Sequence, residues 1–229
     1  MLRIVSVIFV VFLSLNAAQG QINVYAGYRT SFTSPESFNA IIEAHNDAFR
    51  IDGATYSDMR MSEIKYLHGV DLGLRYSFRS GAVQAGWINR RKQVRSDVPQ
   101  FTNRVSTSIN TFNFGYYPTF GNFSLGATAD YNLLRIKNEL ERRGGIPTPP
   151  KDVQNPMKGD AWSSHFSIGY EFSNDGYFSL KIEPYIQVYW DDYNLADLSA
   201  AIAPDYSGST REEFMTFGVS FIVYNGPRR

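Results

Sequence analysis

Hydrophobic and polar side chains alternate at every second position through much of the chain. In the segment 66–78, aromatic, aliphatic and histidine side chains occupy the even positions, whereas Asp71, Gly73, Arg75 and Ser77 occupy odd ones. Successive side chains of a β-strand point to opposite faces, so this period of two predicts a strand with one apolar and one polar face. The same alternation marks seven further segments, at 21–31, 83–87, 112–116, 123–133, 162–172, 178–190 and 215–224.

The connections between these segments are either very short or long. The short ones have turn residues: Ser80-Gly81, Pro118 to Gly121 and Asn174-Asp175-Gly176. The long ones span residues 33–63, 95–104, 138–160 and 191–213. Short turns at one end and long loops at the other are typical of an up-and-down transmembrane β-barrel. We therefore predict an all-β, eight-stranded antiparallel barrel, although a further hairpin at 49–55 would raise the number of strands to ten.

The two faces of these strands differ in character. The apolar face carries Tyr, Trp and Phe towards the strand ends, as an aromatic girdle at a membrane interface does. The other face carries Gly, Ser, Thr and charged residues, which is an unusual composition for a solvent-exposed exterior. We therefore predict that the apolar face is turned outwards to lipid. A soluble barrel of the lipocalin type, with its apolar residues inside, is the alternative that a period of two leaves open.

The first 20 residues form a separate segment. Arg3 supplies a positive charge, residues 4–15 are almost entirely apolar, and Ala18-Gln19-Gly20 offers small residues for cleavage. This pattern predicts a secretory signal peptide, cut before Gln21, which leaves residues 21–229 as the barrel domain. The apolar stretch is too short for a membrane anchor, which needs roughly 20 residues.

Composition excludes several classes of function. The chain contains 22 basic and 22 acidic residues, so it lacks the basic surplus of a nucleic-acid-binding protein. It contains no cysteine, which rules out disulfides, thiolate metal sites and a cysteine nucleophile. The 17 Phe, 15 Tyr and 3 Trp are too many for a disordered chain. No motif for a cofactor is present.

These features resemble the small eight-stranded outer-membrane barrel proteins of Gram-negative bacteria, of the OmpA-transmembrane-domain, OmpX and OmpW type. The resemblance covers Gln21 to Tyr224 and lies in architecture. It implies an integral protein of the outer membrane in contact with lipid and lipopolysaccharide. Such a protein stabilises the envelope or presents loops to a protein partner, alone or as a subunit of a larger complex. A narrow channel or transporter for small or hydrophobic solutes is the alternative. Residues 225–229 follow the last aromatic residue, which departs from the terminal aromatic that many such proteins have.

The inward face is predicted to carry a polar network. Its members are Asp71, Arg75, Asp130, His165, Glu171, Lys181 and Glu183. An eight-stranded barrel leaves a bore that side chains fill, and each buried charge then needs a partner. We therefore expect a structural plug, with a narrow ion path as the alternative.

Catalytic chemistry has only one weak candidate. His165 and Ser167 share a strand face with Glu171, an arrangement that resembles the His-Ser-Glu site of the lipid A deacylase PagL. These residues lie on the inward face, where an acyl chain does not reach them, so we predict no enzyme activity and no catalytic residue. His45 and His68 have no second ligand at metal-binding spacing, so we predict no metal site.

The first long connection is predicted to contain a short amphipathic helix. Ser34-Pro35-Glu36 is a helix start, and Phe38, Ile41, Ile42 and Phe49 follow along one stripe. We expect this helix to cover the barrel mouth or lie at the lipid headgroups, with docking to another protein as the alternative.

Charge is divided unevenly between the other connections. The second hairpin has a basic outer end formed by Arg90, Arg91, Lys92, Arg95 and Arg104, a candidate rim for lipopolysaccharide phosphates. The fourth connection has an acidic set, Asp191, Asp192, Asp197 and Asp205, that would suit a divalent ion or a basic partner. The simpler interpretation of both is a solvated rim.

Overall fold

The structure is a computed structural model that describes residues 20–48, 59–98, 101–142, 152–153, 157–173 and 178–225. The predicted signal peptide, Phe49, the proposed extra hairpin at 49–55 and the turn at 174–176 lie outside these residues. Among the residues described, neither helix has the length and apolar composition needed to cross a bilayer.

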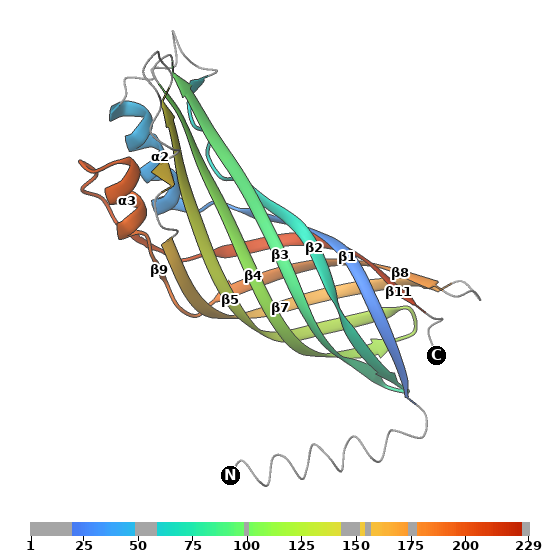
Figure 1. The fold of residues 1–229 in the computed structure, drawn as a ribbon. Helices are drawn as coiled ribbons and strands as arrows, with labels where there is room; N and C mark the ends of the chain where they lie inside the picture. The colour runs from blue at the N-terminus through green and yellow to red at the C-terminus, as the bar shows by residue number, and fades with distance from the viewer. Residues whose placement is uncertain are drawn as a thin grey trace.

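Long antiparallel strands close into an eight-stranded barrel, as the alternation predicted (Figure 1). The barrel strands are β1 (Gln21–Thr33), β2 (Tyr66–Phe78), β3 (Gly81–Val98), β4 (Phe101–Phe120), β5 (Phe123–Arg142), β7 (Met157–Ser173), β8 (Phe178–Tyr189) and β11 (Met215–Asn225). Each strand pairs with the next one along the chain, and β1 pairs with β11 to close the sheet. Three short strands are not part of the barrel wall. β6 (Asp152–Val153) pairs with β5, and β9 (Tyr193–Asn194) pairs with β10 (Arg211–Glu212).

The apolar face of the strands is on the outside. Phe217 is 62% exposed, whereas Lys181 is 1% exposed, which reverses the pattern of a soluble protein. Large aromatic and aliphatic side chains are exposed along every one of the barrel strands except the short outward stretch of β3, where Trp87 is half-buried. The predicted lipid-facing orientation is confirmed, and the lipocalin-type alternative is excluded because the interior is polar.

Four strands extend well beyond the thickness of a membrane. β4 and β5 have 20 residues each, whereas a transmembrane strand needs about 9–11. On the outer face of β4, Phe112 to Phe120 are mostly apolar, while Arg104 to Asn110 are polar. The half of β4 that precedes Phe112 therefore projects out of the bilayer, together with the paired parts of β3, β5 and β7.

The connections on either side of β4 are shorter than predicted. The segment 95–104, expected to be a loop, is mostly strand, because β3 continues to Val98 and β4 begins at Phe101. The expected turn from Pro118 to Gly121 is also tighter, since β4 runs to Phe120. Gly121 has a φ of 57°, a backbone angle that favours glycine in such a turn.

Two helices and the projecting strands form a second core, which we call the outer cap. The helix α2 (Glu36–Ala48) is the one predicted, and α3 (Ala196–Ile202) lies beside it at the long-strand end, opposite the end where β1 begins and β11 ends (Figure 1). The core contains apolar residues from the helices, from β2, β3, β4, β5, β7, β8 and β9, and from the connections: Phe38, Ile41, Ile42, Met61, Ile64, Leu67, Val94, Val105, Ile109, Leu134, Ile136, Met157, Tyr189, Tyr193, Leu195, Leu198, Ile202 and Phe214. As predicted, α2 buries Phe38, Ile41 and Ile42, and it covers the barrel mouth.

Candidate functional site

The barrel interior contains a balanced set of buried charges. The four cations are Arg29, Arg75, Arg90 and Lys181, and the four anions are Asp71, Asp130, Glu171 and Glu183. All seven residues of the predicted polar network are buried inside the wall. Because little water is available there, the opposite charges must neutralise one another.

Three of these cations form ion pairs across or along the lumen. Arg75 on β2 contacts Glu171 on β7 at 2.9 Å, and Lys181 contacts Glu183 within β8. Arg29 on β1 donates to Asp71 on β2 at 2.8 Å. The same cations also lie over aromatic rings: Arg29 over Tyr185 at 4.6 Å, Arg75 over Tyr224 at 4.6 Å and Lys181 over Tyr117 at 4.4 Å. The rings and carboxylates together replace the water that these cations lose.

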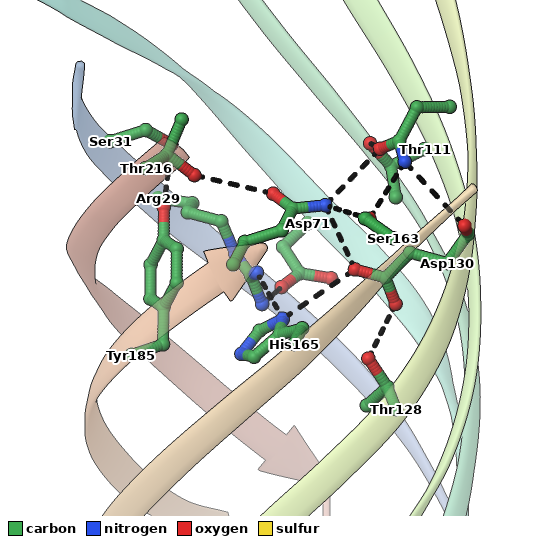
Figure 2. Close-up of polar contacts among 12 residues, drawn as sticks. Arg29, Ser31, Asp71, Thr111, Thr128, Asp130, Ser163, His165, Tyr185 and Thr216 are labelled. Atoms are coloured by element: carbon green, nitrogen blue, oxygen red, sulfur yellow. Dashed lines mark hydrogen bonds and ion pairs between the residues drawn. The ribbon is translucent and has the colours of Figure 1, made fainter. Parts of the chain in front are cut away.

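His165 is surrounded by charges and is not arranged for catalysis. Arg29 donates to its Nδ1 at 3.1 Å, so this nitrogen is an acceptor (Figure 2). Carboxylates of Asp130 and Glu183 lie 3.8 and 3.9 Å from the two ring nitrogens. Neither Nε2 of His165 nor the hydroxyl of Ser167 has a hydrogen-bond partner among the described residues. The two groups therefore form no nucleophile-base pair, which is the feature that a serine nucleophile requires.

Arg90 does not belong to the basic rim in which the sequence analysis placed it. Its side chain is fully buried in the lumen, where Nη1 donates to Oε1 of Gln187 at 2.8 Å. Nη2 donates to Thr111 at 3.0 Å and to Tyr189 at 3.4 Å. The prediction was wrong because the alternation was followed only to residue 87. Continued through Ile88, it puts Arg90 on the inward face.

Neutral polar side chains link the charged groups into a plug. Gln187 on β8 donates to Asp130 at 3.0 Å and to Ser163 at 2.7 Å. Thr111 on β4 donates to Asn132 at 2.7 Å, and Asn132 donates to Ser163 at 2.8 Å. Figure 2 shows Thr111, Asp130 and Ser163 pointing into this network from separate strands. The network ties β4, β5, β7 and β8 together through the middle of the barrel.

Above the plug, polar side chains of α2 fix the outer cap in place. Asn39 bonds both backbone groups of Ile64, at 2.8 and 3.2 Å, and Asn46 does the same with Met61, at 2.9 and 3.1 Å. His45 donates from Nδ1 to the carbonyl of Ile202 at 2.9 Å, and its Nε2 lies 3.2 Å from the hydroxyl of Ser96. Burial lowers the pKa of His45, so the ring stays neutral and can accept at Nε2.

Glu212 on β10 caps the start of α2. Its carboxylate accepts the backbone N–H of Phe38 at 2.8 Å, one of the donors that the first turn of a helix leaves unpaired. Burial raises the pKa of Glu212 to about 7, against the lowering effect of the backbone N–H groups. Glu212 lies in the acidic fourth long connection, and no local pattern in the sequence links it to a helix about 170 residues earlier.

The other predicted rim residues lie on projecting strands and do not converge. Arg91 is exposed on the outer face of β3, and the ammonium of Lys92 lies 3.8 Å from the ring centre of Tyr66. Arg95 pairs with Asp97 beside it. Arg104 on β4 lies 3.5 Å from Glu141 on β5.

The acidic set is spread over the surface of the fourth connection. The side chains of Asp191, Asp192, Asp197 and Asp205 are all exposed. No group of three or more His, Asp or Glu side chains suited to a metal ion occurs in the described part of the chain. His68 faces outwards, with its Nδ1 2.9 Å from the hydroxyl of Tyr28.

Comparison with known proteins identifies the fold. No family model and no curated protein matches the chain. Among solved structures, Ail of Yersinia pestis in complex with the heparin analogue sucrose octasulfate has a TM-score of 0.51 at 10% identity, over 90% of this chain and 98% of Ail. Neisserial surface protein A is also similar, with a TM-score of 0.42 at 8% identity over 90% of this chain and 98% of that protein. OprG of Pseudomonas aeruginosa has a TM-score of 0.41 at 12% identity over 91% of this chain and 94% of OprG. The chain has the fold of the small eight-stranded outer-membrane β-barrels.

Proposed function

We propose that this chain is a non-conducting barrel of the outer membrane that holds the outer cap at the cell surface as a binding surface for an external partner. The observation that carries the proposal is the hydrophobic core between α2, α3 and the projecting strands. Such a core is what a rigid recognition surface needs, because side chains packed at native density keep the surface in one shape.

The arrangement of the lumen supports the non-conducting part of the proposal. A solute would have to break three charge pairs and then pass an apolar core that covers the mouth. Both steps are costly, because separated charges would be buried without partners. A channel or transporter for small or hydrophobic solutes is therefore less well supported. A ligand at the surface suits this fold, since Ail has been solved with a sulfated sugar.

Labelling in intact cells tests the proposal, and the absence of cysteine makes an introduced thiol unique. Asp197→Cys places a thiol on the exposed surface of α3, and Asn122→Cys is the matched control at the turn end. A membrane-impermeant maleimide should label Asp197→Cys in intact cells, and Asn122→Cys only after the outer membrane is permeabilised.

The same thiol then tests for a partner. A crosslinker attached at Asp197→Cys should give a discrete adduct at the cell surface, whereas the control should not give this adduct. Reversed accessibility of the two thiols would overturn the proposal. A cap thiol that is labelled from outside but forms no discrete adduct would also contradict it.

A further inference from the structure

Basic side chains form a row across four strands on the outer wall of the barrel. Arg91 on β3 lies opposite Ser108 on β4, Ser108 opposite Arg135 on β5, and Arg135 opposite Lys158 on β7. Residues directly opposite one another in a sheet share a face, and neighbouring strands lie about 4.8 Å apart. These four residues, which we call the basic row, therefore lie side by side although up to 67 positions separate them in the sequence.

The charges of the basic row have no carboxylate partner among the residues that the structure describes. Within the described parts of the chain, no Asp or Glu lies within ion-pair distance of Arg91, Arg135 or Lys158. Arg91 donates only to the neutral amide oxygen of Asn89, at 2.9 and 3.1 Å. The nearest acid along the strand, Asp160, accepts a hydrogen bond from Tyr131 at 3.0 Å. Even with Asp160 included, three positive charges and one negative leave a net charge of +2.

A parallel row of aromatic side chains fixes the depth of the basic row in the membrane. Trp87, Phe112, Tyr131 and Trp162 lie opposite one another on the same four strands. They are four residues closer to the turn end, which is roughly 13 Å along a strand. Aromatic belts mark the level of the lipid headgroups. The basic row therefore lies at, or just outside, the headgroups of the outer leaflet.

A groove joins the two rows. It has a volume of about 300 Å³ and lies on the outer wall between β3 and β7. Its apolar lining comes from Trp87, Phe112 and Leu133. Its charged edge comes from Arg135, Lys158 and Asp160, so the cations outnumber the one carboxylate. A ligand that fits must combine an apolar or sugar portion near the bilayer with an anionic group further out.

We propose that this groove binds the phosphorylated glucosamine headgroup of lipopolysaccharide, with Arg135 and Lys158 on the phosphate and Arg91 as a third cation. Guanidinium and ammonium groups form strong charge-assisted hydrogen bonds to phosphate. A free phosphate ion would use the cations but not the apolar lining, whereas lipopolysaccharide uses both. The site differs from the rim predicted from the sequence, since Arg135 and Lys158 come from β5 and β7. It does not depend on the proposed role of the outer cap.

Thermal unfolding in a neutral detergent tests the proposal. Adding bisphosphorylated lipid A to the folded protein should raise the midpoint of unfolding, and lipid A without phosphates should raise it by less than half as much. The double variant Arg135→Gln/Lys158→Gln should lose at least half of the shift caused by the phosphorylated lipid. Lys65→Gln, an exposed lysine at the same end of the barrel but outside the row, is the control and should keep the full shift.

Two controls accompany this measurement: one for the folding of each variant and one for selectivity towards the lipid headgroup. Heat-modifiable migration on gels shows that each variant is folded before lipid is added. An equal shift with dephosphorylated lipid A would overturn the proposal, as would an unchanged shift in the double variant. Equal stabilisation by phosphatidylglycerol or by inorganic phosphate would also overturn it, because either result would show that binding depends on negative charge alone.

Discussion

Arg75 on β2 and Glu171 on β7 meet inside the barrel with their charged atoms 2.9 Å apart. The two strands are not neighbours in the wall, so this ion pair spans the bore. Both side chains are about 4% exposed, and the guanidinium also lies over the ring of Tyr224. The pair is therefore a direct link between opposite parts of the wall, and it blocks the path along the barrel.

Breaking this pair should destabilise the barrel strongly. Arg75→Met removes the cation that faces the buried carboxylate of Glu171 at 2.9 Å, so the free energy of unfolding should fall by about 3–5 kcal/mol. Arg75→Met/Glu171→Leu removes both charges and should recover most of that loss. Urea unfolding in lipid vesicles measures the difference. A double variant that is less stable than Arg75→Met would contradict the ion-pair account.

The same substitution should have very different effects on stability at two adjacent arginines of β3. Arg90→Gln removes a buried guanidinium that donates hydrogen bonds to four acceptors in the lumen. The free energy of unfolding should fall by about 3 kcal/mol or more. Arg91→Gln changes an exposed side chain and should alter the free energy of unfolding by about 0.5 kcal/mol or less. Equal effects in the unfolding assay would mean that the inward and outward faces of β3 are wrongly assigned.

The alternation of side chains predicted most of the charged residues that face inwards. It placed Lys181 and Glu183 on the inward face, where the structure has them, because a one-residue error would have put charges into lipid. It missed Arg29 as a member of the network, although Arg29 shares a face with Asn23 and Tyr25. Following each alternation to its end would have found this cation.

Glu212 should make the outer cap more stable at mildly acidic pH than at alkaline pH. Its pKa is raised from 4.5 to about 7 in the folded protein, so the folded state binds the proton more tightly than the unfolded state. The resulting stability is fully present below about pH 4.5 and is lost as the pH rises through 7. Limited proteolysis of the cap should be faster at pH 8 than at pH 6.

Glu212→Gln is the control for this effect. The glutamine oxygen still accepts the N–H of Phe38 but does not titrate, so the change in cleavage rate between pH 6 and pH 8 should largely disappear. His45 acts in the opposite sense, because its pKa is lowered and its stabilisation is lost as the pH falls below 6.5. The difference between wild type and Glu212→Gln isolates the carboxyl group. An unchanged pH dependence in the variant would refute its role.

Replacing His45 should loosen the cap without opening the barrel. His45→Ala removes the links from α2 to Ile202 and Ser96, so amide exchange in α2 should speed up about tenfold or more, as expected for the loss of one or two buried hydrogen bonds. Asp47→Ala, on the exposed side of the same helix, is the matched control and should have little effect. Hydrogen exchange in the membrane part of β4 should stay slow in both variants. Faster exchange there in His45→Ala would show that the cap and the wall unfold together.

The outer cap was the part that the sequence did not predict. α2 was recognised from its apolar stripe, but α3 has only seven residues and lies in a connection dominated by acidic side chains. The core also depends on Val94, Val105 and Ile136, which lie beyond the segments 83–87, 112–116 and 123–133 in which the alternation was followed. Long-range packing decides whether such segments remain extended, and it leaves little trace in local sequence.

Ion conductance of the purified protein in planar bilayers tests most directly whether the barrel is sealed. The ion pairs in the lumen and the apolar core at the mouth predict no steady current above that of the bare bilayer. A reproducible open state with a stable conductance in the wild-type protein would contradict the sealed barrel, and with it the proposal that the barrel serves to hold the cap at the surface.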